Sequence, residues 1–182
     1  MADDLRALIF RTDSVETSAV PGWSGLVASS RGLRLLGLPV CTEAAAVDYI
    51  RQCYQDVAMA PDDPFLQQVA IQVLAYLAGE LREFDVELDL RGHTPFALSV
   101  WATAARIAYG ETRTYGWIAD QVGGPGAAQA VGAALGSNPV PLIVPCHRVL
   151  GSDGSLHGFA GGLEMKARLL AMESGQWALA LE

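Results

Sequence analysis

Three kinds of residue are scarce in this chain of 182 residues: cysteine, histidine and the basic residues. The three cysteines are Cys41, Cys53 and Cys146, and the first ten residues show no signal-peptide pattern. So few cysteines argue against a disulfide framework and for a reducing cytoplasm. Cys41 and Cys53 also lack the paired spacing of metal ligands, so we predict no metal site.

The chain also lacks a long uninterrupted hydrophobic segment. Hydrophobic residues make up 51% of it, and the mean hydropathy of +0.26 allows a substantial core. Residues 121–147 are nearly uncharged, but glycines and prolines interrupt them repeatedly. A bilayer span needs about 20 consecutive apolar residues. We therefore predict no membrane segment.

Positive charge is in short supply, with 12 Lys and Arg against 20 Asp and Glu, a net charge of −8. Residues 1–91 hold 14 acidic and 7 basic residues, giving −7, and residues 92–182 hold 6 and 5, giving −1. An acidic protein is repelled by a polyanion such as DNA. Composition alone therefore argues against a nucleic-acid partner.

The length suits one domain or two small ones. Patterning favours an α+β fold, with an N-terminal α+β domain at 1–91 and a mainly helical domain at 92–182. In the first domain the predicted strands are 5–10, 25–30, 33–36 and 86–90, and the predicted helices are 42–54, capped by Thr42, and 65–79.

The second domain shows four helical patterns, at 96–108, at 114–122 with Thr114 as the cap, at 125–135 and at 163–174. The last is predicted to pack through Leu163, Ala167 and Leu170. Two short helices joined by Gly123-Gly124 match the outline of a helix-turn-helix, although many helical hairpins bind nothing.

The segment Pro145-Cys146-His147-Arg148-Val149 carries the candidate chemistry. A cysteine is a nucleophile as the thiolate, which needs a base or a positive field nearby. His147 is a candidate base, but neighbours in a strand point to opposite faces. Contact with Cys146 therefore requires a bend or a bridging water. The alternative is a buried cysteine that only packs.

Several collinear motifs surround this segment. They are residues 109–115, 136–141, 143–149, 161–163 and 166–170. On these motifs the chain resembles, from Thr94 to Ser174, the O6-alkylguanine-DNA alkyltransferases, which repair DNA by taking an alkyl group onto their own cysteine. The resemblance implies a ribonuclease H-like N-terminal α/β domain followed by a helix-turn-helix alkyltransferase domain.

The same resemblance implies the catalytic roles. Cys146 is the alkyl acceptor, and His147 is its base, acting through a water. Glu173 orients His147, Tyr115 donates a proton to the departing guanine, and Asn138 braces the turn. The spacing of Glu173 from Leu169 and Leu170 independently points its carboxylate inward. The alternatives are a surface glutamate, a packing tyrosine and a simple Asn-Pro turn.

Guanine binding is assigned by resemblance as well. The carbonyls of Cys146 and Val149 read the guanine amino group, Pro141 and Phe159 line the pocket, and the Ala160 amide lies near O6. The product is a thioether that no group here reverses. The implied enzyme is thus a methylated-DNA–protein-cysteine S-methyltransferase that acts once and needs no cofactor.

The DNA-binding helix departs from the family pattern. Gln129 occupies the place of the arginine that replaces the flipped base, and Ala127 and Ala128 allow close approach to the minor groove. No Lys or Arg occurs from Thr114 to His147, so we expect weak binding of DNA. The remaining candidates for phosphate contact are Arg113, Arg148, Lys166 and Arg168.

Two functions stay open at this point. We favour a monomeric cytoplasmic repair protein that acts on double-stranded DNA containing O6-alkylguanine. The alternative is a divergent member with weak or no DNA binding, which uses Cys146 on a small alkyl donor or electrophile. A module that only binds damage ranks last, because the cysteine is present. A cysteine hydrolase lacks support from any oxyanion-hole or acyl-pocket motif.

Overall fold

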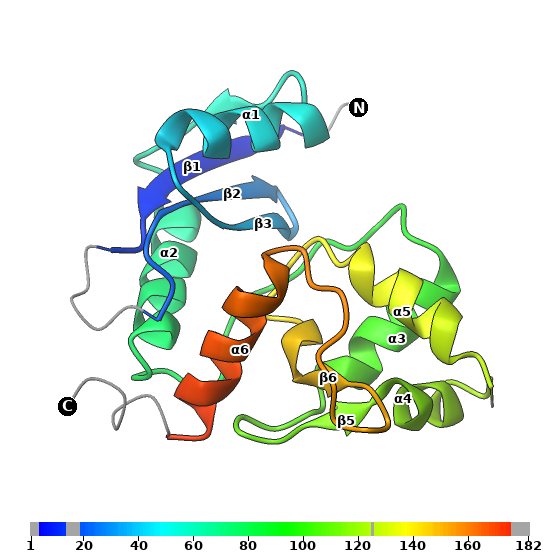
Figure 1. Ribbon diagram of the computed structural model, residues 1–182. Coiled ribbons are helices and arrows are strands. Elements are labelled where there is room, and N and C mark those ends of the chain that lie inside the picture. The colour runs from blue at the N-terminus through cyan, green and yellow to red at the C-terminus, as the bar shows by residue number, and fades with distance from the viewer. Residues whose placement is uncertain (1–3, 14–18, 125, 176–182) are drawn as a thin grey trace. The chain divides into compact units, whose positions relative to one another are not determined.

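The computed structural model describes residues 4–13, 19–124 and 126–175, which form two compact units, Met1–Leu90 and Arg91–Glu182 (Figure 1). Both units mix helices with small sheets. Within the described residues every helix is too short or too polar to cross a bilayer.

The first unit is built on a four-stranded sheet with the strand order β3-β2-β1-β4. The strands are β1 (Arg6–Arg11), β2 (Trp23–Ser29), β3 (Gly32–Val40) and β4 (Ala58–Met59). Strands β1, β2 and β3 are antiparallel neighbours, and β4 runs parallel to β1. The hairpin between β2 and β3 turns at Ser30-Arg31, one residue before the turn at 31–32 that separates the predicted strands.

Two helices cover this sheet, α1 (Glu43–Cys53) and α2 (Pro64–Leu77), and they lie on opposite faces (Figure 1). Ala7, Val27 and Leu35 are register partners that form a core with Ile50 of α1. Because neighbouring residues in a strand alternate between faces, the next register row points toward α2. The predicted N-cap of α1 is correct, since the Thr42 side chain accepts from the amide of Ala45.

The predicted strand at 86–90 is wrong in extent. Only an isolated bridge forms, between Leu88 and Leu33, with hydrogen bonds from Leu33 to Glu87 and from Asp89 to Leu33. The buried side chain here is polar: the Asp89 carboxylate accepts from Ser29 and Arg34. These side-chain hydrogen bonds and the single bridge attach the segment to the sheet, where the prediction expected a continuous series of backbone hydrogen bonds.

The second unit packs α3 (Pro95–Ala104), α4 (Tyr115–Gln121) and α5 (Ala128–Gly136) against one another. A parallel pair, β5 (Arg113–Thr114) and β6 (Val149–Leu150), flanks the short 3-10 helix η1 (Cys146–Arg148), and α6 (Gly162–Glu173) packs on η1. The indole of Trp101 ties α3 to α5 by donating to the Ala134 carbonyl at 2.8 Å.

Three details of these helices correct the predictions. Helix α3 ends four residues early, because bonds to carbonyls three residues back tighten the chain after Ala104. Helix α5 begins at Ala128, and Pro125, its predicted start, lies outside the described residues. The inward face of α6 is also different: Leu163 and Ala167 are exposed, and the buried residues are Lys166, Leu169, Met172 and Glu173.

Candidate active site

A tight turn before Cys146 sets the position of its thiol. Pro141 and Val144 form an isolated bridge, and Leu142 has φ of +72°, a left-handed conformation that is uncommon outside glycine. The Cys146 amide donates to the Val144 carbonyl at 2.8 Å, and the chain then enters η1. The segment is therefore bent, which is one of the two conditions under which Cys146 and His147 can act together.

The Asn138 side chain closes this turn and contacts the sulfur. Its Nδ2 donates to the Val144 carbonyl at 2.9 Å and to Cys146 Sγ at 3.4 Å. Its Oδ1 accepts from the Val140 amide at 3.0 Å. One side chain thus fixes the turn and places a hydrogen-bond donor on the sulfur, an interaction that favours the thiolate.

The Cys146 thiol is 9% exposed, and this burial raises its pKa above the ordinary value. The Asn138 hydrogen bond and the positive charge of Lys166 act in the opposite direction but do not overcome burial. The sulfur is therefore protonated at neutral pH. A base must remove the proton before the sulfur can act as a nucleophile.

His147 is fully buried, and its Nε2 lies 2.8 Å from Oε1 of Glu173 at the end of α6. Burial lowers the pKa of His147, and the hydrogen bond to Glu173 only partly offsets this effect. The imidazole is therefore neutral at neutral pH and able to accept a proton. Glu173 would compensate the charge of the imidazolium formed in that step.

The structure contradicts the predicted DNA contact of Arg148, which is 5% exposed. Its Nε donates to both oxygens of Glu173 at 3.1 and 2.9 Å, and its Nη2 donates to Oε1 at 2.9 Å. Nη1 donates to the Ile107 carbonyl at 2.6 Å, and the Gly110 amide adds a bond to Glu173 at 3.1 Å. The guanidinium faces inward because the buried carboxylate requires a partner.

Lys166 is buried too, so the phosphate contact considered for it is also wrong. Its Nζ donates to the Val149 carbonyl at 2.6 Å and to the His157 carbonyl at 3.2 Å, and it lies 5.9 Å from the centre of the Tyr115 ring. Burial lowers the pKa of Lys166, and the Cys146 thiolate opposes this shift. Lys166 is the only lysine in the sequence. It lies three residues before Leu169, so the two share one face of the helix, and this spacing could have predicted that Lys166 points inward.

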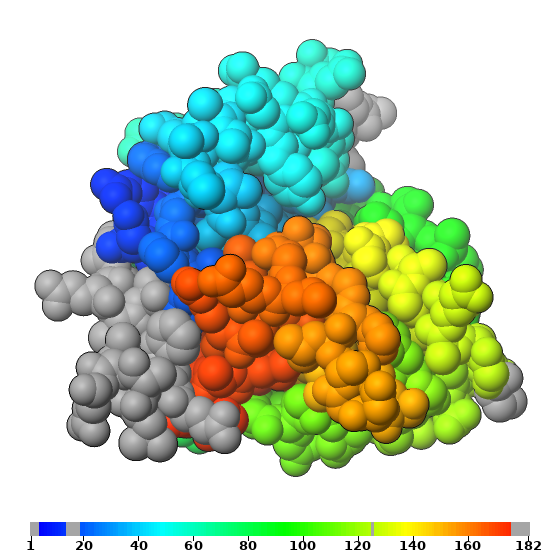
Figure 2. Space-filling model, in the orientation of Figure 1, coloured from blue at the N-terminus to red at the C-terminus, as the bar shows by residue number. Residues whose placement is uncertain are grey.

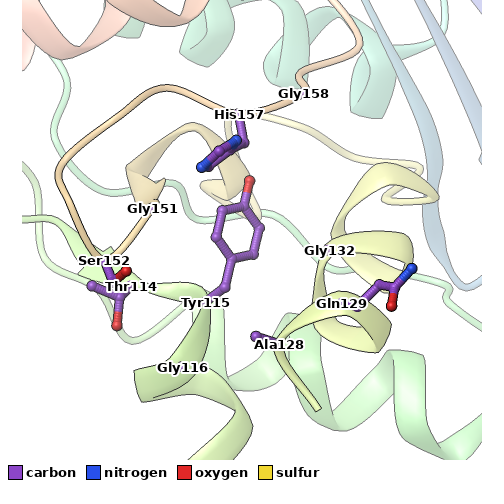
Figure 3. Close-up of a pocket in the computed structure, with 10 residues that line it drawn as sticks. All are labelled: Thr114, Tyr115, Gly116, Ala128, Gln129, Gly132, Gly151, Ser152, His157 and Gly158. Carbon is purple, nitrogen blue, oxygen red and sulfur yellow. The ribbon is translucent and has the colours of Figure 1, made fainter. Parts of the chain in front are cut away.

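A pocket of about 550 Å³ lies beside this cluster, between α4, α5 and the segment after β6 (Figure 3). Figure 2 shows the yellow atoms of α5 and the orange atoms of that segment side by side on the surface. The pocket is lined by Thr114, Tyr115, Gly116, Ala128, Gln129, Gly132, Gly151, Ser152, His157 and Gly158. Burial raises the pKa of Tyr115, a lining residue of the pocket, and the charge of Cys146 adds to the shift.

The residues predicted to bind guanine do not line this pocket. Phe159 is half-buried with its ring 6.4 Å from that of His147, and Ala160 is exposed. Among the described residues, both lie outside the lining of the pocket, as do Pro141 and Cys146.

Of the predicted DNA-binding residues, Gln129 is exposed on α5, while Ala127 and Ala128 are half-buried at its start. Arg113 pairs with Glu111 at 2.8 Å and lies over the Trp117 ring. Across the described ranges, no group of three or more His, Cys, Asp and Glu side chains is arranged to hold a metal ion.

Comparison with known proteins identifies the family. Residues 95–175 match the model of the DNA-binding domain of 6-O-methylguanine DNA methyltransferase. The chain is 55% identical over 116 residues to a methylated-DNA–protein-cysteine methyltransferase of Mycobacterium bovis, covering 64% of this chain and 70% of that protein. It is 39% identical over 152 residues to the inducible protein of that name from Bacillus subtilis, covering 83% and 84%.

A solved structure extends the likeness along the chain. The crystal structure of Mycobacterium tuberculosis OGT in complex with DNA matches with a TM-score of 0.75 and 40% sequence identity, and the match covers 94% of this chain and 93% of that chain. The sequence relatives and the structural match agree with the motifs around the buried cysteine. The chain belongs to the O6-methylguanine-DNA methyltransferase family.

Proposed function

We propose that this protein repairs DNA by transferring an alkyl group from O6 of guanine to Sγ of Cys146, once per molecule. The observation that carries the proposal is a buried thiol beside a buried, neutral His147 that is hydrogen-bonded to Glu173. The family favours DNA as the substrate over a small electrophile, since a relative in the family is solved with DNA.

In this mechanism the thiol proton passes through a water to His147, whose imidazolium Glu173 stabilises. The thiolate then attacks the alkyl carbon, so that a C–S bond forms as the C–O6 bond breaks. The bonding electrons pass to guanine, which takes a proton from Tyr115. This phenol is protonated at neutral pH because burial raises its pKa. Asn138 holds the sulfur in line throughout.

Guanine recognition is assigned to the groups around the thiol. The carbonyls of Cys146 and Val149 would accept from the guanine amino group, with Pro141, Phe159 and the Ala160 amide around the ring and O6. The Val149 carbonyl already accepts from Lys166. A carbonyl oxygen has two lone pairs, so it can accept a second hydrogen bond from the base.

We assign DNA docking to α4 and α5 as a helix-turn-helix within an alkyltransferase domain at 92–182. Ala127 and Ala128 would approach the minor groove, Gln129 would fill the place of the extruded base, and Arg113 would contact phosphate. Residues 1–91 would form the ribonuclease H-like domain. We propose that the protein acts as a monomer in the cytoplasm on double-stranded DNA.

The test is the intact mass of the protein after incubation with duplex DNA that contains O6-methylguanine. We expect each molecule to gain one methyl group, and peptide mapping to place it on Cys146, because nothing in the site can cleave a thioether. Repair must then stop at one lesion per molecule when DNA is in excess. Sustained turnover would exclude the mechanism.

The pH dependence of the reaction with free O6-benzylguanine follows from two shifted pKa values. Below the lowered pKa of His147 the imidazole is protonated and cannot accept the thiol proton, so the rate falls on the acid side. On the alkaline side the rate should rise again only as the pH approaches the raised pKa of Cys146, where the thiol ionises without the help of His147. Single-turnover rates from about pH 5 to 9 should therefore rise to a plateau once His147 is neutral and should not fall at the alkaline end. A maximum near neutral pH would contradict this assignment.

Gln129→Arg tests the weak binding of DNA. A cation on exposed α5 should speed repair of duplex DNA and steepen the salt dependence of binding by about one unit. Reaction with free O6-benzylguanine needs no base extrusion and should hardly change. Equal rates for wild type and variant on duplex DNA would show that this position does not limit binding.

A further inference from the structure

The pocket in Figure 3 has an exposed imidazole, that of His157, on the side opposite α5. Among the ten described residues that line the pocket, His157 alone has a side chain that can carry a positive charge. The sequence has no Lys or Arg from Thr114 to His147, and Arg148 and Lys166 are buried. Among the described lining residues, His157 is therefore the one that could offer a positive charge to a negatively charged ligand.

A chain of hydrogen bonds orients the imidazole. The Asp153 Oδ1 accepts from the Ser155 amide at 3.0 Å and from its hydroxyl at 2.5 Å, and Ser155 Oγ lies 3.0 Å from His157 Nε2. The hydroxyl has one proton, which it donates to the carboxylate, so Oγ accepts from Nε2–H. When the imidazole is protonated, its Nδ1 is a second donor.

The loop of residues 151–157 surrounds this series of hydrogen bonds. A Cβ on Gly151 would lie 2.6 Å from His157 Nε2 and 2.7 Å from both Asp153 Oδ1 and Ser155 Oγ. The three polar groups therefore converge over Gly151, where an added side chain would have to displace them. The Gly151 amide donates to the Ser155 carbonyl, and Lys166 holds the His157 carbonyl from beneath. The imidazole is thus placed by the fold and is not a freely rotating surface group.

We propose that His157 binds the backbone phosphate of the nucleotide that enters this pocket. The inference rests on the proposed function, because it takes an alkylated nucleotide as the ligand. Tyr115 lines the pocket and is near enough to Cys146 for that charge to act on its phenol, so a nucleotide whose base is directed to Cys146 would leave its sugar and phosphate in the pocket, beside the imidazole. There Nδ1–H donates to a phosphate oxygen in a charge-assisted bond. The charged and titratable groups that face His157 are Asp153, Tyr115 and Lys166.

The experiment compares wild type, His157→Gln and His157→Lys in the full chain. Repair rates of an O6-methylguanine duplex are measured under limiting protein over a salt series, beside rates with free O6-benzylguanine. His157→Gln should flatten the salt slope by about one unit, while its rate with the free base stays within about two-fold of wild type. His157→Lys, which keeps a cationic donor, should restore the slope.

Arg106→Gln is the matched control, because Arg106 is an exposed cation of the same unit outside the pocket lining. It should leave the slope at the wild-type value. An unchanged slope in His157→Gln would overturn the proposal, and so would an equal change in Arg106→Gln or a parallel loss with the free base. Wild-type protein that takes no alkyl group from either substrate would overturn the proposed function instead, and this inference with it.

Discussion

Cys146→Ala should accept no alkyl group from DNA or from free O6-benzylguanine. In the proposed mechanism the Cys146 sulfur is the atom that forms the new bond, and the other cysteines, Cys41 and Cys53, belong to the other unit. Folding should be nearly unaffected, with a change in unfolding free energy of about 1 kcal/mol. The reason is that Asn138 keeps its bond to the Val144 carbonyl when the sulfur is removed. Intact mass and urea unfolding check both parts.

The matched control is the double variant Cys41→Ala and Cys53→Ala, which should take one alkyl group at the wild-type rate. Cys146→Ser should be inactive as well, because a hydroxyl ionises far less readily than a thiol and is a weak nucleophile without a strong base. Alkylation of Cys146→Ala at any cysteine would mean that the acceptor has been misassigned.

Glu173→Gln should lower the free energy of unfolding by about 3–5 kcal/mol, the usual cost of removing one member of a buried ion pair. The carboxylate is the common partner of His147, Arg148 and the Gly110 amide, and its loss leaves the buried guanidinium without its counter-charge. Alkyl transfer should also slow, because the imidazolium formed during catalysis loses its stabilising anion. Urea unfolding measures the first effect and single-turnover kinetics the second.

Glu164→Gln supplies the comparison on the same helix. Glu164 pairs with Arg168 one turn away on the exposed surface, so its loss should cost at most about 1 kcal/mol. Adding Arg148→Met to Glu173→Gln should recover part of the stability, because both buried charges are then gone. Strictly additive losses in that double variant would show that the Arg148–Glu173 pair is not the source of the effect.

Local sequence signals predicted much of the secondary structure. The cap of α1 at Thr42 and the cap of α4 at Thr114 are where the sequence places them, because a cap is a contact between residues three apart. The β2–β3 hairpin and α2 follow for similar reasons. The family motifs around Cys146 likewise identify the candidate nucleophile and its base, because these two residues are adjacent in the chain.

The errors occur where distant residues compete with local preference. Residues 86–90 alternate like a strand, yet the buried Asp89 anchors them to Ser29 and Arg34, so they form a single bridge. Periodicity assigned Leu163 and Ala167 to the inner face of α6, whereas Lys166 and Glu173 lie inside. Two polar residues can be buried there because each finds partners on η1 or β6.

By itself the sequence determined the family, the candidate nucleophile and the inward carboxylate, because these depend on residue type and spacing along the chain. Only the tertiary structure decided which cationic side chains are buried and which lie on the surface. Arg148 and Lys166 read as surface charges in a sequence, but burial of Glu173 and of the Val149 carbonyl draws both inward, since buried polar groups must be paired. The same folding places the His157 imidazole, hydrogen-bonded to Ser155, in the lining of the pocket.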